Sequence, residues 1–219
     1  MVENDAFLAI EAHVMVAVVR TATPHQAIEV CRALTRGGMA ILEITMTIPD
    51  ATTVISEISK DSRTVVGAGS VTSVAQAEAV LKAGARFVVS PVKAPAIIPI
   101  CHRGGAPCVI SGLTPTEIFE AHEAGADIVK VFPASSVGGP SFIRALREPM
   151  PQLRMMPSGG VGPDNMGDYL KAGAVALAVG GSLMPLRAVE RGEYEEVEKR
   201  ARNYVAVLEE IRRAMAAER

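Results

Sequence analysis

One junction of small residues recurs along the chain and limits the folds that it can adopt. Copies read RGGMAILEIT at 36–45, KAGARFVVSP at 82–91, EAGADIVKVFP at 123–133 and KAGAVALAVGG at 171–181. In each copy a charged residue and a glycine-containing group of small residues precede a short apolar run. That order is typical of a helix that ends at a glycine cap and is followed by a buried strand. The sequence therefore predicts alternating helices and strands.

Other apolar runs complete the series of predicted strands. They cover 14–20, 64–70, 107–112 and 153–160, which brings the strands to eight, and helical stretches such as 24–36, 73–83, 115–124 and 163–172 lie between them. Strands that are apolar throughout are typical of a parallel sheet covered on both faces. Eight such units without a Pro- or Gly-rich linker favour one (β/α)₈ (TIM) barrel domain over residues 1–219, rather than a doubly wound sheet.

Two further helices are expected outside the eight units. An extra N-terminal helix over 3–12 precedes the first strand, and a long charged helix over 192–217 follows the last. The charge run RGEYEEVEKRAR at 191–202 is interpreted as a solvated helix face rather than an interaction site.

Composition argues against several kinds of partner. The net charge is −2 and aromatic residues make up 4% of the chain, so a nucleic-acid partner is not expected. No uncharged apolar run approaches the roughly 18 residues that suggest a membrane span, and the acidic start does not resemble a signal peptide. Cys31, Cys101 and Cys108 form no CxxC pair, which favours free thiols in a reducing compartment. We therefore expect a cytoplasmic protein without a membrane partner.

Metal chemistry and serine hydrolysis find little support in the sequence. The histidines are scattered, at His13, His25, His102 and His122. None falls at the carboxyl end of a predicted strand, whereas a metal site needs clustered ligands. A Ser-His-Asp hydrolase of the nucleophile-elbow type needs a GxSxG turn, and none occurs. We expect no metal.

Polar residues interrupt the apolar runs near the ends of the predicted strands. They are Arg20, Glu43, Thr45, Ser70, Ser90, Ser111, Lys130, Ser158 and Ser182. In a (β/α)₈ barrel the catalytic groups lie at the carboxyl ends of the strands and on the loops that follow. These residues are therefore expected to converge at one end of the barrel.

Lys130 and Glu43 are the two charged residues placed inside apolar strands, in ADIVKVFPAS (126–135) and AILEIT (40–45). An unpaired buried charge is costly, so the two side chains need a structural or a chemical purpose. One interpretation is a structural ion pair across the barrel. The other is a lysine made nucleophilic by desolvation, which forms a Schiff base with a carbonyl substrate while Glu43 transfers protons.

Two glycine pairs indicate a bound anion. SGGVGPDN (158–165) and VGGSLMP (179–185) follow the seventh and eighth strands, where barrels often bind a phosphate. Glycines let backbone N–H groups approach an anion, and Ser158 or Ser182 offers a further hydroxyl donor. The alternative is that these glycines only form tight turns.

Several blocks resemble one enzyme family, the 2-keto-3-deoxy-6-phosphogluconate (KDPG) and 4-hydroxy-2-oxoglutarate (KHG) aldolases. They are GGMAILEITMTIPDA (37–51), VVGAGSVTSVAQA (65–77), AGARFVVSP (83–91), LTPTEI (113–118), AGADIVKVFPAS (124–135), MPSGGVGPDN (156–165) and AVGGSLM (178–184). The resemblance runs in order from about Val14 to Met184, and the KxFPA and LExT blocks are specific to the family.

The resemblance implies a fold, a chemistry and a site. The fold is a (β/α)₈ barrel of the class I aldolase type, usually assembled as a homotrimer. The chemistry needs no metal or cofactor, because a lysine forms an imine with the substrate. Lys130 takes the role of the Schiff-base lysine and Glu43 that of the general acid/base. Ser70 falls where the family has a substrate-contacting threonine. Pro91 and Phe132 are expected to line the pocket, and Gly159, Gly160, Gly180, Gly181 and Ser182 to surround the distal phosphate or carboxylate.

Besides Ser70, the chain departs from the family pattern at four positions. Thr47 stands where many members have an arginine that binds the keto-acid carboxylate. A branch of the family keeps an arginine at the end of strand 1, so Arg20 is expected to bind that group in a bidentate contact. Ser111 and Val92 replace the usual proline and glycine, and Ser158 replaces a threonine.

The resemblance implies reversible cleavage of a small 2-keto-4-hydroxy acid to pyruvate and an aldehyde. With KDPG, a substrate of the Entner–Doudoroff pathway, that aldehyde is glyceraldehyde 3-phosphate, and with KHG it is glyoxylate. Two alternatives stay open, namely cleavage of the galactonate epimer and a non-catalytic barrel that binds phosphosugars.

Overall fold

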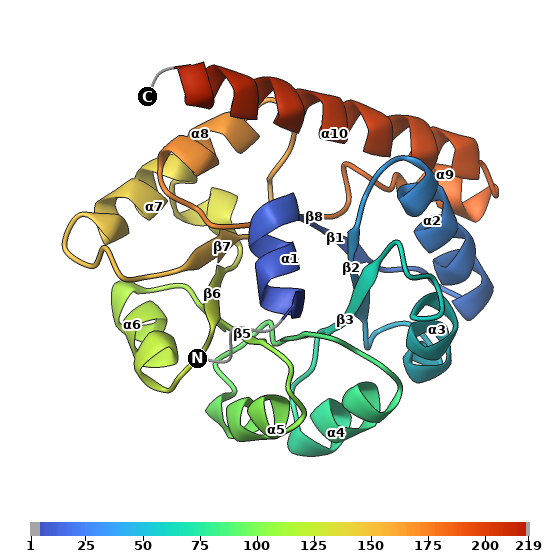
Figure 1. Ribbon diagram of the computed structural model, residues 1–219, viewed down its shortest axis with the longest axis horizontal. Coiled ribbons are helices and arrows are strands. Elements are labelled where there is room, and N and C mark those ends of the chain that lie inside the picture. The colour runs from blue at the N-terminus through green and yellow to red at the C-terminus, as the bar shows by residue number, and fades with distance from the viewer. Residues whose placement is uncertain (1–4, 218–219) are drawn as a thin grey trace.

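The computed structural model describes residues 5–217 and confirms the (β/α)₈ barrel (Figure 1). Its strands are β1 (Met15–Val19), β2 (Ile41–Thr45), β3 (Val65–Gly69), β4 (Val88–Val89), β5 (Cys108–Gly112), β6 (Ile128–Val131), β7 (Met155–Pro157) and β8 (Leu177–Val179). They are parallel and lie in the order β7-β6-β5-β4-β3-β2-β1-β8. A bridge between Ser158 and Ala178, with a 3.0 Å hydrogen bond from Val175 N to Met155 O, brings β8 against β7.

Helices alternate with the strands and form the outer layer. They are α2 (Pro24–Arg36), α3 (Ala51–Ile58), α4 (Val74–Lys82), α5 (Ile98–Arg103), α6 (Pro115–Glu123), α7 (Pro140–Arg147), α8 (Met166–Lys171) and α9 (Leu186–Glu190), with short 3₁₀ turns η1 (Pro95–Ile97) and η2 (Ala134–Val137). Local sequence sets where several of them begin. Thr114 and Glu117 form a reciprocal capping box around Pro115 at the start of α6.

Two helices lie outside the eight units, as expected. α1 (Asp5–His13) precedes β1, and α10 (Tyr194–Ala217) follows α9. The predicted N-terminal helix began at residue 3, and residues 3 and 4 lie outside the described part of the chain. Within residues 5–217, no helix combines the length and apolarity that a membrane crossing requires.

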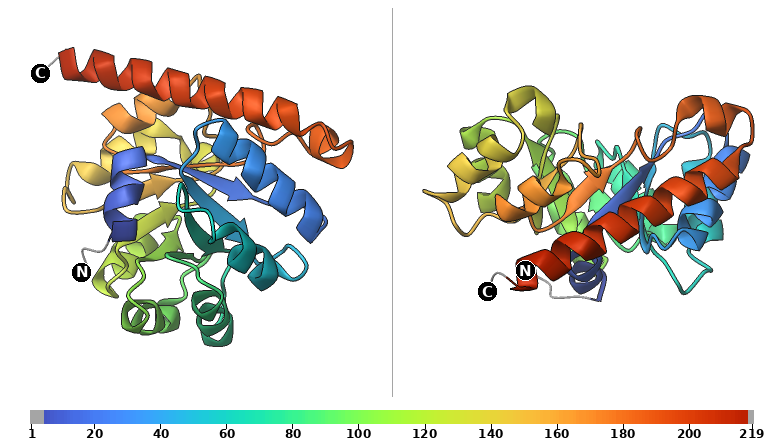
Figure 2. Two further views of the ribbon diagram at one scale, coloured as in Figure 1. Left: turned by 45° about the vertical axis from the view of Figure 1, so that its right-hand side comes forward. Right: turned by 90° about the horizontal axis from the view of Figure 1, so that it is seen from above.

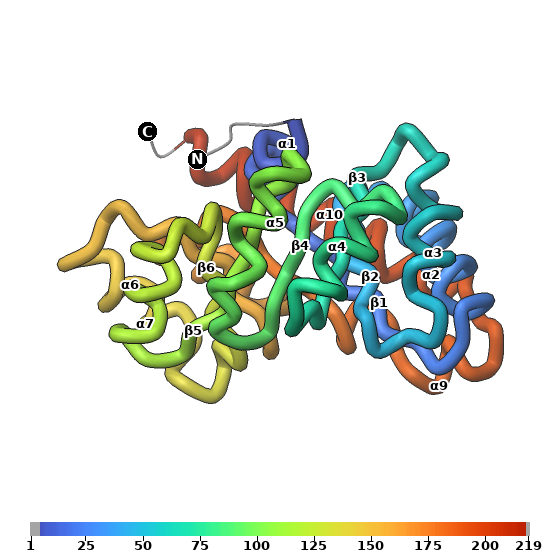
Figure 3. The backbone as a smooth tube through the Cα atoms, turned by 90° about the horizontal axis from the view of Figure 1, so that it is seen from below, coloured from blue at the N-terminus to red at the C-terminus, as the bar shows by residue number. Residues whose placement is uncertain are grey.

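α1 covers the amino-terminal end of the barrel. Its buried Phe7 and Ile10 pack against an apolar cluster inside the barrel that contains Val16, Ile41, Phe87, Val109, Ile128 and Met156. Figures 2 and 3 show α1 at one end of the barrel and α9 at the other. Because the strands are parallel, their carboxyl ends all lie at the end away from α1. That end is the one where a barrel builds its site.

Candidate active site

Lys130 and Glu43 meet inside the barrel. Successive side chains of a strand point to opposite faces, so Lys130 shares the inner face with Ile128, and Glu43 shares it with Ile41. Each charged residue lies two positions closer to the carboxyl end of its strand than the apolar residue that shares its face. Lys130 Nζ lies 3.5 Å from Glu43 Oε1, and the residues are 5% and 1% exposed. Their joint burial is the central feature of the site.

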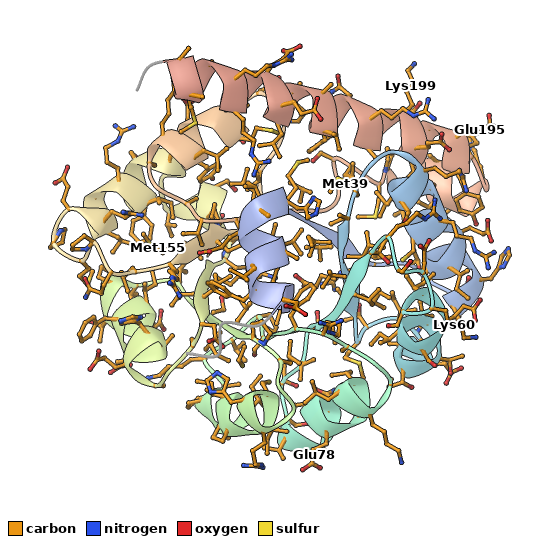
Figure 4. All side chains as sticks on the ribbon, in the orientation of Figure 1. Met39, Lys60, Glu78, Met155, Glu195 and Lys199 are labelled. Atoms are coloured by element: carbon orange, nitrogen blue, oxygen red, sulfur yellow. The ribbon has the colours of Figure 1, made fainter. Side chains whose placement is uncertain are left out.

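The other lysines are placed differently. Figure 4 shows Lys60 and Lys199 pointing away from the barrel. Lys60 pairs with Glu57 at the surface, where its side chain is 72% exposed. Lys93, the lysine nearest to the carboxyl end of β4, forms an exposed ion pair with Glu120. Lys130 is thus set apart by its burial and by its partner.

Gly69 makes room for the Glu43 carboxylate. A Cβ atom at Gly69 would lie 2.1 Å from Glu43 Oε1, well inside van der Waals contact, so a larger residue here would displace the carboxylate. Glu43 Oε2 is buried and has no hydrogen-bond partner among the described residues. Buried polar atoms are usually paired, so this oxygen is available to a bound molecule.

A cavity of about 580 Å³ lies near Lys130, although neither Lys130 nor Glu43 is among the residues that line it. Phe132 links the two, because its ring lines the cavity and its centroid lies 5.7 Å from Lys130 Nζ. Seven other predicted site residues line the same cavity, namely Arg20, Ser158, Gly159, Gly160, Gly180, Gly181 and Ser182. The remainder of the wall is apolar, with Val18, Val161, Ala178, Met184, Leu186 and Val189. The fold thus brings together the strand ends of β1, β6, β7 and β8.

Ser70 and Pro91 lie outside the lining of this cavity. Ser70 follows Gly69 and adopts a left-handed backbone conformation with φ 59°, which is uncommon for a residue other than glycine. Its neighbour Gly69 is the residue that packs against the Glu43 carboxylate. Pro91 follows Ser90, whose hydroxyl accepts a 3.4 Å hydrogen bond from Val92 N.

Thr45 and Thr47 join the end of β2 to the end of β1. Thr45 Oγ1 donates to the carbonyl oxygen of Val19 at 2.9 Å and lies 2.8 Å from Thr47 Oγ1. Since the single Thr45 proton is used, Thr47 is the donor in that second bond. Arg20, the next residue after Val19, is exposed and forms no ion pair among the described residues. Its guanidinium is therefore free to bind a ligand in the cavity.

Sequence reasoning missed a contact between α10 and the cavity rim. Ser182 Oγ lies 2.6 Å from Tyr204 Oη, and Arg200 Nη1 donates to Ser182 O at 3.0 Å. Arg200 belongs to the run at 191–202, whose charge pattern predicts a solvated face. The sequence does carry a signal for a buried face on this helix, namely the helical spacing of its apolar residues. Its buried residues are Val197, Ala201, Tyr204 and Leu208.

The described residues contain no group of three or more His, Cys, Asp or Glu side chains arranged to hold a metal ion. The chemistry that the site offers is that of a buried amine beside a carboxylate. The cavity beside that pair is lined by one guanidinium and two glycine loops.

Comparison with known proteins adds an independent observation. The family model for KDPG and KHG aldolase matches residues 8–200. The chain is 35% identical over 193 residues to the 2-dehydro-3-deoxy-phosphogluconate aldolase of Treponema pallidum, covering 87% of this chain and 91% of that one. It is 35% identical over 181 residues to the KHG/KDPG aldolase of Escherichia coli K12, covering 82% and 84%. The solved structure of native KDPGal matches with a TM-score of 0.81 at 28% identity, covering 91% of this chain and 96% of that one.

Proposed function

This chain belongs to the KDPG and KHG aldolase family and is a carbon–carbon lyase, and from that premise we propose that it cleaves KDPG reversibly to pyruvate and glyceraldehyde 3-phosphate. The observation that carries the proposal is the buried contact between Lys130 and Glu43, which lies beside Phe132 of the cavity wall. We further propose that Lys130 acts through an imine, as in a class I aldolase.

The proposed reaction begins at Lys130. The unprotonated amine attacks the C2 ketone, and the resulting carbinolamine loses water to give an iminium ion. Glu43 then removes the proton from the C4 hydroxyl. The C3–C4 bond breaks, its electrons pass to the iminium group to form an enamine, and the aldehyde departs. Protonation of the enamine at C3, followed by hydrolysis, releases pyruvate and restores the amine of Lys130.

The cavity supplies binding groups for both ends of the substrate. Arg20 is proposed to hold the keto-acid carboxylate, which every substrate of this reaction carries. The glycine loops at 158–165 and 179–185 are proposed to surround the distal phosphate. Among the described residues, the backbone N–H groups of Gly160, Gly181 and Ser182 have no acceptor within the chain, which suits them to bind an anion.

KHG is a second candidate substrate, because the matched family model and the Escherichia coli relative carry both names. Its distal carboxylate could occupy the position of the phosphate. The galactonate epimer is a third, favoured by the similarity to native KDPGal. We also propose, on the family resemblance, that the protein works as a homotrimer in the cytoplasm. Ultracentrifugation of the purified protein checks the number of subunits.

Borohydride trapping tests the imine. Incubation with pyruvate and sodium borohydride should add a stable adduct to a peptide that contains Lys130, as measured by mass spectrometry. Lys130→Met should abolish both the adduct and cleavage. Lys93→Ala, which removes a surface lysine, is the matched control and should retain both. Because the proposed mechanism uses no metal ion, EDTA should leave the cleavage rate unchanged.

An adduct on Lys93, or the absence of any adduct, would contradict the assignment. In the second case the Lys130–Glu43 contact would be a structural ion pair in a non-catalytic barrel that binds phosphosugars.

A further inference from the structure

The long C-terminal helix reaches the rim of the cavity through one buried tyrosine. Tyr204 of α10 is 3% exposed, and its Oη lies 2.6 Å from Ser182 Oγ in the loop after β8. Ser182 Oγ in turn donates to the carbonyl oxygen of Val161, in the loop after β7, at 3.5 Å. Since a serine hydroxyl has a single proton, the order of donation is Tyr204 to Ser182 to Val161. A chain of two hydrogen bonds therefore joins both glycine loops to α10.

A second contact holds the same loop by its backbone. Arg200, one turn before Tyr204, donates from Nη1 to the carbonyl oxygen of Ser182 at 3.0 Å. Its guanidinium is oriented by Glu196, which accepts from Arg200 Nε at 2.8 Å. Ser182 is thus held at its hydroxyl and at its carbonyl by two side chains of one helix.

α10 itself is held in place because it packs closely against α2. A Cβ atom at Gly37, which follows α2, would lie 2.4 Å from Ala201 Cβ, so the two helices approach as closely as glycine permits. Arg36 and Glu198 add an ion pair of 2.7 Å between the same helices. Figure 1 shows α10 lying across the side of the barrel beside α2 and α8.

The Tyr204 phenol keeps its proton over a wide pH range. Burial raises its pKa above the ordinary value of 10 and the nearby Asp164 adds to this, whereas the hydrogen bond with Ser182 and the nearby Arg200 lower it without reversing the rise. The phenol therefore remains a hydrogen-bond donor toward Ser182 at neutral pH.

The Ser182 hydroxyl is occupied by Tyr204 and Val161, so it does not serve as a donor to a ligand in this arrangement. The backbone N–H groups of Gly181 and Ser182 are the groups that stay open toward an anion. The hydrogen bonds of Tyr204 and Ser182 connect these groups to the loop at 158–165.

We propose that Tyr204 and Arg200 are positioning residues, which set the spacing of the two glycine loops and thereby the affinity for the distal anion of the substrate. The inference rests on the proposed function, because it assigns that anion to these loops. Tyr204 lies beyond the residues that the family model matches, which end at 200.

Tyr204→Phe tests the proposal because it removes the donor and keeps the ring in place. We expect KM for KDPG to rise about 3- to 10-fold with kcat nearly unchanged, the usual effect of one lost hydrogen bond. The inhibition constant of inorganic phosphate, used as a competitive inhibitor, should rise by the same factor. The rate of pyruvate trapping at Lys130 should be unchanged, since pyruvate has no distal anion.

Two further variants make the experiment decisive. Ser182→Ala should raise KM similarly, and the double variant should add little to either single change, because both break the same bond. Tyr194→Phe, at the start of the same helix, is the matched control and should leave KM unchanged. An unchanged KM in Tyr204→Phe, or a loss of kcat with slower pyruvate trapping, would overturn the proposal. Failure of wild-type protein to trap pyruvate would instead overturn the proposed function.

Discussion

At the residue scale, the Lys130–Glu43 contact is poorly suited to a purely structural role. Charge-assisted hydrogen bonds are usually about 2.7–2.9 Å long, whereas Lys130 Nζ and Glu43 Oε1 are 3.5 Å apart. Glu43 Oε2 is also buried without a partner among the described residues. A buried ion pair offsets its desolvation cost only when its geometry is good and its remaining atoms are bonded. The unpaired oxygen of Glu43 therefore favours a role in binding or proton transfer over a purely structural role.

Replacing Glu43 with glutamine should therefore impair catalysis more than folding. Gln keeps the shape of the side chain but cannot accept the C4 proton, so kcat should fall about 10²- to 10⁴-fold. Pyruvate trapping at Lys130 should become slow rather than absent. Steady-state cleavage rates, together with urea unfolding, check this expectation. Cleavage close to the wild-type rate would assign Glu43 a structural role only.

At the scale of elements, one aspartate joins three of them at the end of the barrel away from the cavity. Asp127 directly precedes β6 and is 3% exposed. Its Oδ2 accepts a hydrogen bond from Cys108 N at the start of β5 and lies 2.8 Å from His102 Nε2 in α5. This end of a barrel generally serves stability rather than catalysis.

Asp127→Ala should destabilise the fold without altering the chemistry. It leaves the buried Cys108 N–H without an acceptor, which should lower the free energy of unfolding by about 1–3 kcal/mol. His102→Ala is the control that keeps this acceptor and removes only the outer partner, so its cost should be smaller. Urea titration measures both effects. A large fall in kcat for folded Asp127→Ala protein would contradict the separation of the two ends.

At the scale of the whole molecule, the order of elements was predictable because each junction carries its own local signal. The residues at which the strands end were harder to predict. Apart from Arg154, the run at 153–160 is apolar or small, but β7 ends at Pro157, because Gly159 and Gly160 adopt positive φ values of 87° and 78° and turn the chain away. The location of Tyr204 beside the loops could not be predicted. Its stripe on α10 indicates a buried face, but which surface covers that face depends on how the helix crosses the closed barrel.

Closure of the barrel also decides what surrounds Arg20. β1 pairs with both β2 and β8, so Arg20 at the end of β1 lies between Thr47 on one side and the loop after β8 on the other. Its guanidinium can therefore serve either the keto-acid carboxylate or the distal phosphate. The carboxylate is favoured because Thr47 has no positive charge, and no other arginine or lysine lines the cavity within the described residues.

Arg20→Ala distinguishes the two placements. If Arg20 binds the carboxylate shared by all substrates, the variant should lose about 10- to 100-fold in kcat/KM for KDPG and for KHG alike, and pyruvate trapping at Lys130 should slow as well. Arg20→Lys should recover little, because an ammonium group cannot reproduce a bidentate contact with a carboxylate. Parallel kinetics with both substrates and a trapping time course supply the measurement. A defect confined to KDPG, with KHG cleavage and pyruvate trapping intact, would show that Arg20 binds the distal phosphate instead. Arg20 would then act beside the loop that contacts Tyr204 and Arg200.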